Sequence, residues 1–368
     1  MKTLEDLRRF AVGRSLFPPT TLKRALDKMG FVQADPIRAP ARAQDLTLRH
    51  RVNNYRAGDL ERRYAELAVE EDFFVSYGFV TRSLQALMHP RQKTWTEVRG
   101  KQARLVLEFV RDRGEAHPRE VEERFSLGTV KNNWGGSSNT TTMLLDSMHY
   151  RGLLRVTRRE GGIRVYAIHE HSGGPSDPAA RRARIDALVD AAVNVYAPLP
   201  LNGLSSLVSR LRYAAPQWRG ELKAALERAK NRMASAEIAG ATWYWPIGET
   251  AGVNNGGGQQ TDAVRLLAPF DPLVWDRARF EMLWGWAYRF EAYTPIPKRK
   301  LGYYALPLLW RDHVIGWGNL TINDGRLNAD LGYVKSPPRD GVFKRELDSE
   351  LDRMRTFLRL QANTRRSE

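Results

Sequence analysis

The sequence LLRVTRREGGIRVYAI, residues 153–168, decides how the middle of this chain folds. Apolar and polar side chains alternate from Leu153 to Thr157 and again from Ile163 to Ile168, which predicts two β-strands. The residues between them, 158–162, end in two glycines and predict the turn of a β-hairpin.

Three helices are predicted before this hairpin. Ala103, Val106 and Phe109 begin the first with helical spacing, and a shorter one runs from Pro118 to Phe125. A third helix has its apolar residues within 143–148. The residues that can cap its start are Ser137, Ser138, Asn139 and Thr140. Three helices followed by a hairpin make a winged helix, a variant of the helix-turn-helix, and we assign it to residues 100–171.

Residues 1–99 are predicted to form a first winged-helix-like domain. A helix starts at about Leu4 and is broken at Pro18-Pro19. A second helix is capped by Thr20 or Thr21 and ends at Gly30, where a left-handed terminator is expected. A short extended run then leads from Phe31 to Asp35 and stops at Pro36.

The remaining chain divides after a Gly-, Ser- and Pro-rich linker at 172–178. Residues 179–247 are predicted to form a third winged-helix-like domain, and residues 263–335, rich in Trp, Tyr and Phe, a small β-barrel domain. A C-terminal helix is expected within 340–364. The predicted fold class is therefore α+β, with tandem winged-helix domains followed by a β-barrel and a helix.

The charge of the chain indicates a polyanionic partner. Among 368 residues there are 58 Lys and Arg against 42 Asp and Glu, which gives a net charge of +16. The charge is uneven, because residues 1–56 carry 12 basic and 5 acidic residues, whereas residues 57–77 carry six acidic and two basic ones. We therefore expect one basic face rather than a uniformly basic surface.

The absence of cysteine excludes disulfides, thiolate zinc sites and cysteine nucleophiles. It fits a reducing compartment, and we expect a bacterial cytoplasmic protein located at the nucleoid. No stretch reaches the ~20 apolar residues that span a bilayer, and residues 1–6 lack the apolar core of a signal peptide. We expect no membrane partner and a monomeric protein.

Gln33 and Asp35 form the one polar pair that has a clear chemical use. They flank Ala34, and Pro36 favours an extended conformation at Asp35, so both side chains are expected on the same side of the strand. The carboxylate can activate a water or stabilise a developing cation, and the amide can hold that water. The alternative, which the motif by itself favours, is that Asp35 only caps the turn at Pro36 and Gln33 is solvated.

The hairpin predicted at 153–168 is rich in arginine. Phosphate contact is the favoured role for these residues, with a plain solvated hairpin as the alternative. The candidates are Arg155, Arg158, Arg159 and Arg164. Residues 137–140 can donate to a phosphate at a helix N-terminus, although capping explains them equally well. A second group of basic and aromatic residues has two alternative roles, contact with DNA or a place in the barrel core. Its members are Arg289, Tyr293, Lys298 and Arg299.

Five segments together resemble the AlkZ/YcaQ-type crosslink-repair DNA glycosylases, over nearly the whole chain. The segments are QAD (33–35), ARAQDLTL (41–48), WGGSS (134–138), RFEAYTP (289–295) and KRKLGYYALP (298–307). The resemblance implies tandem winged helices, a β-barrel and a catalytic signature of Gln, an apolar residue, then Gln or Asp. Gln33 and Asp35 match the Gln/Asp form, while Gln44 stands where many members place a histidine. Residues 70–78 also differ from the segment found in some members, and both departures bear on substrate range.

The implied function is a monofunctional glycosylase that hydrolyses cationic N7-alkylguanines in double-stranded DNA, including those in interstrand crosslinks. Its competitor is a non-catalytic winged-helix regulator or architectural protein; a nuclease is disfavoured, because no acidic cluster has two-metal spacing. No cofactor is expected. His169 and His171 can face one metal, but no third ligand is evident, so no metal site is predicted.

Overall fold

The computed structural model describes residues 1–91, 96–131, 137–171, 173–175, 177–249 and 262–360. Its contacts group the chain into two units. Unit 1 consists of Met1–Leu60, Asp190–Val208 and Leu226–Glu368, and unit 2 of Glu61–Val189 and Ser209–Ala225. Four helices contain the positions at which the chain passes from one unit to the other: α4 (Asp59–Arg62), α9 (Pro178–Tyr196), α10 (Leu201–Ala214) and α11 (Leu222–Arg232). The five domain ranges expected from the sequence remain predictions.

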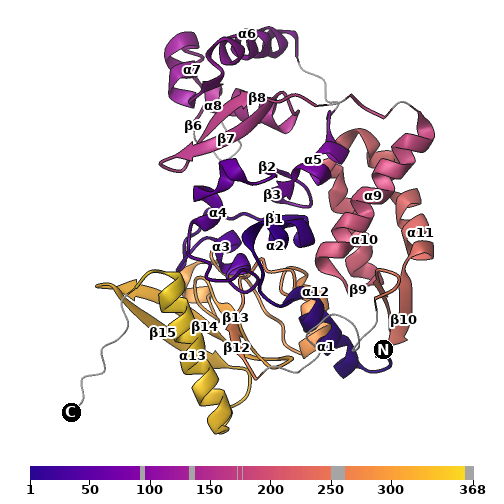
Figure 1. Cartoon of the computed structure of the whole chain (residues 1–368), viewed down its shortest axis with the longest axis vertical. Helices are drawn as coiled ribbons and strands as arrows, with labels where there is room; N and C mark the ends of the chain where they lie inside the picture. The colour runs from indigo at the N-terminus through magenta and orange to yellow at the C-terminus, as the bar shows by residue number, and fades with distance from the viewer. Residues whose placement is uncertain (92–95, 132–136, 172, 176, 250–261, 361–368) are drawn as a thin grey trace. The chain divides into compact units, whose positions relative to one another are not determined.

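In unit 2, the elements predicted for a winged helix occur in the predicted order (Figure 1). They are α6 (Glu97–Arg113), β4 (Glu115–Ala116), α7 (Pro118–Phe125), α8 (Thr140–Tyr150), β7 (Leu154–Glu160) and β8 (Ile163–Ile168). The strands form a sheet in the order β4-β8-β7, and β5 (Thr129–Lys131) pairs with β6 (Ser137–Asn139). Val106, Leu145 and Met148 lie in one buried cluster with Val156 of the hairpin. The tandem arrangement of several such modules stays a prediction.

The hairpin is longer than the sequence pattern indicated. The strands continue to Glu160 and Ile163, which pair directly, so the turn is only Gly161-Gly162. These glycines have φ of 55° and 91°. A two-residue turn that keeps the natural strand twist needs positive φ at both positions, which glycine adopts without strain. Residues 158–160, expected in the loop, are therefore part of β7.

Unit 2 also contains a second hairpin. β2 (Val69–Phe73) pairs with β3 (Tyr77–Thr81), and both are flanked by short helices. These are η1 (Tyr64–Glu66) before β2 and α5 (Arg82–Met88) after β3. The acidic residues Glu70, Glu71 and Asp72 all lie on β2 and are buried. Three of the six acidic residues in the segment 57–77 are thus buried on a strand rather than exposed to solvent.

In unit 1, the N-terminal helices follow the sequence prediction closely. α1 (Leu4–Ser15) is capped by Thr3, and α2 (Leu22–Met29) is capped by Thr21, whose side chain accepts a hydrogen bond from Arg24 N. Gly30, with φ of 69°, ends α2 as predicted. The buried stripe of α2 is Leu22, Ala25, Leu26 and Met29. The short strand β1 (Phe31–Gln33) follows at once, and then α3 (Ala43–Leu48).

The residues expected to form a third winged helix are divided between the units. Their strands lie in unit 1 as a sheet in the order β10-β11-β9. They are β9 (Leu199–Pro200), β10 (Ala234–Ile238) and β11 (Ala241–Trp245). Strands β10 and β11 form a hairpin, and Ala239 and Gly240, with φ of 51° and 75°, form its turn.

The aromatic-rich C-terminal region forms an open half-barrel rather than a closed barrel. Its sheet has the order β12-β13-β14-β15, and among the described strands β12 and β15 are its edges. They are β12 (Val264–Leu266), β13 (Leu306–Trp310), β14 (His313–Asn323) and β15 (Arg326–Tyr333). Between β12 and β13 lie α12 (Arg277–Trp284) and η3 (Ile296–Lys298), where the sequence pattern suggested further strands.

The C-terminal helix α13 (Gly341–Phe357) packs along this sheet (Figure 1). Its buried Glu350 accepts a hydrogen bond from Leu266 N at 2.9 Å and forms an ion pair with Arg49 of the segment after α3. The helix therefore joins the half-barrel to the N-terminal helices within unit 1. No helix in the described part of the chain is long and apolar enough to cross a membrane.

Candidate active site

Gln33 is the last residue of β1, and Asp35 lies in the turn that follows this strand. Phe31 and Val32 are buried and fix the strand, while Gln33 and Asp35 are partly exposed. One carboxylate oxygen of Asp35 accepts a hydrogen bond from Ile37 N at 2.9 Å. Asp35 therefore does cap the turn at Pro36, as the simpler alternative expected. Among the described residues, this is the only hydrogen bond that the carboxylate receives.

The environment of Asp35 makes its carboxylate a stronger base than an exposed one. Burial raises its pKa above the ordinary value, and the hydrogen bond from Ile37 N offsets part of this effect. No described arginine or lysine forms an ion pair with it. A carboxylate with a raised pKa and free hydrogen-bonding capacity is suited to accept a proton from water.

The amide of Gln33 also has an unused polar atom. Its Oε1 is buried and has no hydrogen-bond partner among the described residues. Leaving a buried acceptor without a partner costs about 1–3 kcal/mol, so such atoms are uncommon in folded proteins. The amide oxygen is thus available for a water or a substrate group beside Asp35.

Tyr304 is a further buried polar residue of unit 1, and in the sequence nothing marked it beyond its place in the segment 298–307. It is 3% exposed, and its hydroxyl has no hydrogen-bond partner among the described residues. Burial raises its pKa, and the negative charge of Asp35 raises it further, so the hydroxyl lies within electrostatic range of the carboxylate. Tyr304 therefore keeps its proton and remains a donor.

The segment 41–48, which carried part of the resemblance, has a structural role. Asp45 accepts hydrogen bonds from Tyr55 Oη at 2.7 Å and Gly58 N at 3.0 Å. Just after α3, the fully buried Arg51 donates to both carboxylate oxygens of Asp271, at 2.8 and 3.0 Å. These contacts hold α3 and the segment after it in place within unit 1.

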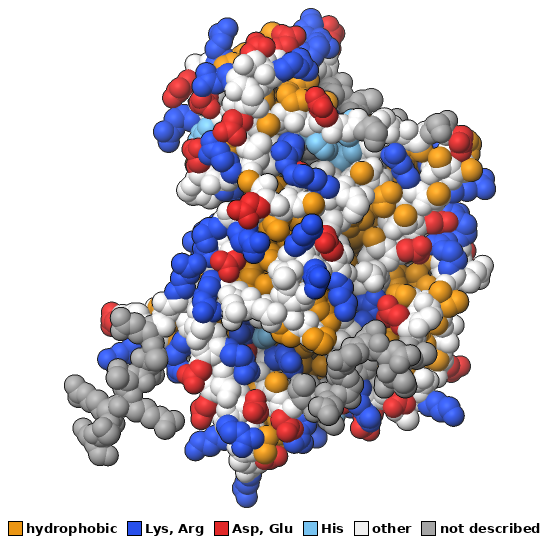
Figure 2. Space-filling model, viewed as in Figure 1, with side chains coloured by type: hydrophobic (Ala, Val, Ile, Leu, Met, Phe, Trp, Pro, Cys, Tyr) orange, Lys and Arg blue, Asp and Glu red, His pale blue; other side chains and the backbone are white. Residues whose placement is uncertain are grey.

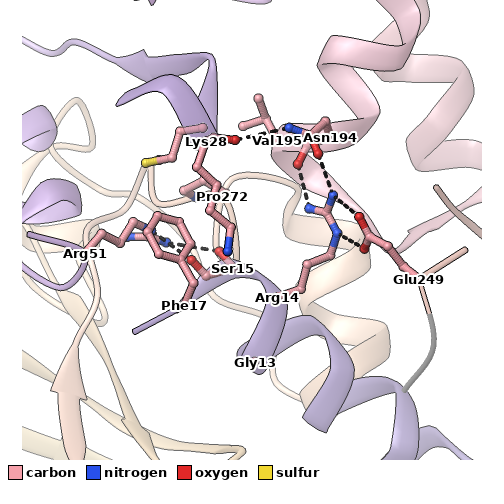
Figure 3. A pocket seen from close by; sticks show the side chains of 11 residues that line it. Gly13, Arg14, Ser15, Phe17, Lys28, Arg51, Asn194, Val195, Glu249 and Pro272 are labelled. Carbon is pink, nitrogen blue, oxygen red and sulfur yellow. Dashed lines mark hydrogen bonds and ion pairs between the residues drawn. The ribbon is translucent and has the colours of Figure 1, made fainter. Parts of the chain in front are cut away.

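A small cavity of about 70 Å³ lies elsewhere in unit 1, between the ends of α1 and α2 (Figure 3). Arg14 donates to the Glu249 carboxylate at 2.6 and 3.1 Å and to Asn194 at 2.6 and 2.9 Å. Lys28 Nζ lies 4.3 Å from the centre of the Phe17 ring. Arg14 and Lys28 occupy the last turns of their helices, where the helix dipole favours positive charge. The Glu249 carboxylate at this cavity is thus already paired with Arg14, unlike the carboxylate of Asp35.

The arginines of the winged-helix hairpin are paired with carboxylates of unit 2. Arg155 binds Glu70 at 2.6 Å, and Arg159 binds Glu71 at 2.5 Å. Both glutamates are the buried residues of β2. Arg164 binds Asp146 at 2.6 Å.

Arg158 differs from these three, because its partners Glu115, at 2.6 Å, and Glu160 are themselves exposed. Its own side chain is 46% exposed. Of the four arginines predicted to contact phosphate, Arg158 is thus the one whose guanidinium is most accessible.

The capping residues of α8 divide into two groups. Asn139 accepts a hydrogen bond from Thr142 N at 2.9 Å and so caps the helix, whose first residue is Thr140. Ser137 and Ser138 lie on β6. The preceding residues 134–136 fall outside the described part of the chain.

The other predicted DNA-binding residues lie on one segment of unit 1, between α12 and β13. Arg289, Tyr293 and Lys298 are exposed, and Tyr293 is 79% exposed. Arg299 is less exposed, and its guanidinium stacks over Tyr303, 5.1 Å from the ring centre. These residues are therefore not part of the barrel core.

The histidines considered as metal ligands pack with a third one. His169 and His171 lie 5.6 Å apart by ring centres, and His89 lies 5.6 and 6.2 Å from them. Nε2 of His89 donates to the buried carboxylate of Asp72 at 2.7 Å. No group of three acidic or histidine side chains among the described residues is arranged to hold a metal ion.

The surface of both units carries many basic side chains. Figure 2 shows Lys and Arg spread over the visible face, with Asp and Glu between them. A net charge of +16 remains after all acidic residues are counted. This charge suits a nucleic-acid partner.

Two comparisons with known proteins agree with these features. The structure is similar over 97% of both chains to Streptomyces sahachiroi DNA glycosylase AlkZ, with a TM-score of 0.58 and 13% sequence identity. At this identity the likeness establishes a shared fold. The family model described as "DNA glycosylase AlkZ-like" matches residues 26–357, which include β1 and the half-barrel. The chain therefore belongs to the AlkZ-like DNA glycosylases and is an enzyme that hydrolyses N-glycosyl bonds in DNA.

Proposed function

We propose that this glycosylase releases cationic N7-alkylated guanines from duplex DNA, with Asp35 and Gln33 as its catalytic residues. The observation that supports this most directly is the pairing of a carboxylate of raised pKa with a buried amide oxygen that has no partner, two residues away. Together they form a place for one polarised water molecule. The non-catalytic regulator is not favoured, because such a protein has no need for this arrangement.

The proposed reaction depends on the positive charge of the alkylated base and the negative charge of Asp35. A guanine alkylated at N7 is cationic, so the bond between C1′ of the sugar and N9 of the base breaks with both electrons passing to the base, which leaves neutral. The sugar acquires oxocarbenium character, which the negative charge of Asp35 stabilises. A water held by Gln33 adds to C1′, and Asp35 accepts its proton. No general acid is needed.

This mechanism implies a selectivity for charge. Neutral bases such as uracil and hypoxanthine need protonation or strong hydrogen bonding as they leave, and neither Gln33 nor an ionised Asp35 provides a proton. Recognition through the sugar and the charge does not require the whole base to enter a tight pocket. We therefore extend the proposal to guanines tethered in interstrand crosslinks.

The basic residues complete the proposal as phosphate contacts. We assign this role first to Arg158, Arg289 and Lys298, which are exposed. Arg155, Arg159 and Arg164 can reach phosphate only by exchanging carboxylate partners, so their contribution is expected to be smaller.

The test is a release assay on matched duplexes that carry one N7-methylguanine, one uracil or one hypoxanthine. We expect free base from the first duplex alone, loss of release with Gln33→Ala, and full release in EDTA. Borohydride should trap no protein–DNA adduct, because the proposed site has no amine nucleophile. Comparable rates on the neutral bases, or a trapped adduct, would falsify this mechanism.

A further inference from the structure

The segment between α12 and β13 has an apolar tip that the proposed catalytic chemistry does not use. Tyr293 is 79% exposed and Ile296 is 75% exposed, so both keep most of their surface in solvent. Pro295 and Pro297 flank Ile296 and are also exposed. Exposed apolar side chains that lie close together often mark an interaction site, whereas a single exposed apolar residue is common on protein surfaces.

The tip is held rigidly at its base. The buried Glu291 accepts hydrogen bonds from Lys300 N at 2.8 Å and Leu301 N at 2.7 Å, which closes the segment into a loop. Arg299 Nε donates to Thr294 O at 2.8 Å across the same loop. The two prolines fix their own φ angles. A loop that is ordered before binding loses little conformational entropy when it binds.

The loop is also anchored to the catalytic side of unit 1. The ring of Phe290 packs against Tyr293 and Tyr304, with ring centres 6.1 and 5.3 Å away. Tyr304 is the buried tyrosine within electrostatic range of Asp35. The exposed tip is therefore connected through two aromatic rings to the proposed site of base release.

The side chains around the tip are positively charged, which favours a polyanionic partner. Arg289, Lys298 and Lys300 are exposed on the loop, and Arg299 adds a fourth positive charge. The only acidic residue in the segment 285–305 is Glu291, whose carboxylate accepts the loop's own N–H groups. An apolar point surrounded by cations matches a DNA groove, where phosphates lie on both sides of stacked bases.

We propose that Tyr293 and Ile296 insert into the base stack of the damaged duplex as a wedge, while the surrounding cations hold the two phosphate backbones. The proposal rests on the proposed function for its substrate. Apolar wedges of this kind partly unstack a base step and kink the duplex. Opening the stack next to the lesion exposes C1′ of the sugar to the water between Gln33 and Asp35 without extruding the whole base.

The experiment uses the full chain with Asp35→Asn, so that binding is observed without base release. The duplex carries one N7-methylguanine beside 2-aminopurine, whose fluorescence rises when it is unstacked. We expect a rise with this protein, no rise when Tyr293→Ala and Ile296→Ser are added, and an affinity for DNA within a few-fold in both cases. Ile247→Ser is the matched control, because Ile247 is 77% exposed but lies outside the loop.

A second measurement uses Asp35 intact. The wedge variants should release base from the fully paired duplex roughly tenfold more slowly or worse. They should recover on a duplex that has a one-nucleotide gap opposite the lesion, where the stack is already open. The wedge would be overturned if the variants lost the same fraction of the base-release rate on both duplexes, or if the fluorescence still rose without the two side chains. It would also be overturned if the substitutions changed the oligomeric state of the free protein, because the tip would then be a protein–protein contact. A fluorescence rise without base release from the wild-type protein would instead refute the proposed function and leave the wedge standing.

Discussion

Two groups of carboxylates in this protein have opposite environments. In unit 1, Asp35 receives one described hydrogen bond, and burial raises its pKa. In unit 2, Asp72 is fully buried but accepts hydrogen bonds from Gln85, His89 and Arg91. Burial alone would raise the pKa of Asp72, yet the charge of Arg91 and the hydrogen bond from His89 lower it far below its usual range.

The difference separates structural from reactive acidic groups. A carboxylate that is saturated with donors has no lone pair left for a substrate, and its partners would be left unpaired if it moved. A partly buried carboxylate with few donors lowers the stability of the folded protein. Its unused capacity to accept hydrogen bonds can serve only a ligand. By this criterion β2 stabilises unit 2, and the turn after β1 is where we propose that the chemistry takes place.

The largest effect is expected from Asp35→Asn. Removing a general base typically costs roughly 10²–10⁴-fold in rate, and we expect base release to fall by that amount. The amide oxygen of asparagine can still accept the hydrogen bond from Ile37 N. The variant should therefore be at least as stable as the wild type in thermal unfolding, because a partly buried charge has been removed. Activity within a few-fold of wild type would contradict the assignment.

The next largest effect is expected at Asp72, whose buried carboxylate accepts several hydrogen bonds. Arg91→Ala leaves the Asp72 carboxylate buried with a missing partner, which typically costs about 3–5 kcal/mol of stability. Arg82→Ala is the matched control, because Arg82 is mostly exposed and its pair with Glu70 should contribute less than about 1 kcal/mol. Denaturant unfolding of the two variants measures the difference. Equal losses would contradict the structural role assigned to the buried ion pair of Asp72 and Arg91.

The sequence alone predicted the elements whose signals are local. Thr21 and Gly30 mark the ends of α2, and two glycines set the hairpin turn at 161–162. The turn's length was misjudged, because arginines at 158 and 159 suggest a loop until their distant glutamate partners are known. Glu115 and Glu71 are 43 and 88 residues away in the chain from Arg158 and Arg159, and no local pattern contains them.

The same limit applies to the site. Gln33 and Asp35 are two residues apart and were visible in the sequence, whereas Tyr304 comes from the far end of unit 1. Its importance depends on a buried hydroxyl that has no hydrogen-bond partner among the described residues, which is a property of packing. The half-barrel was likewise predicted only as a small β-barrel, because aromatic strands predict a curved sheet but not whether its edges meet.

Acid should separate activity from folding. The pKa of Asp35 is raised by burial, so the catalytic carboxylate becomes protonated, and base release falls, at a pH above that of an ordinary aspartate. The pKa of Asp72 is lowered, so its contribution to stability is present above the unfolded-state pKa and is lost only as the pH falls towards the lower folded-state value. We expect reversible loss of activity while circular dichroism still reports a folded chain. Simultaneous loss of both signals would show that the two environments are not distinct in solution.

The smallest effect is expected from Arg158→Ala, which tests whether the exposed end of the hairpin meets DNA. Its partners Glu115 and Glu160 are exposed, so losing these ion pairs should change stability by less than about 1 kcal/mol.

If Arg158 neutralises one phosphate, the slope of log K against log salt should become shallower by about one. Arg159→Ala should change the slope less, since Arg159 already neutralises the buried Glu71, but it should destabilise the fold more. Titrations of one duplex between about 50 and 200 mM salt measure both slopes. An unchanged slope for Arg158→Ala would remove the hairpin from the DNA interface, and a larger change for Arg159→Ala would mean that the ion pair with Glu71 opens when DNA binds.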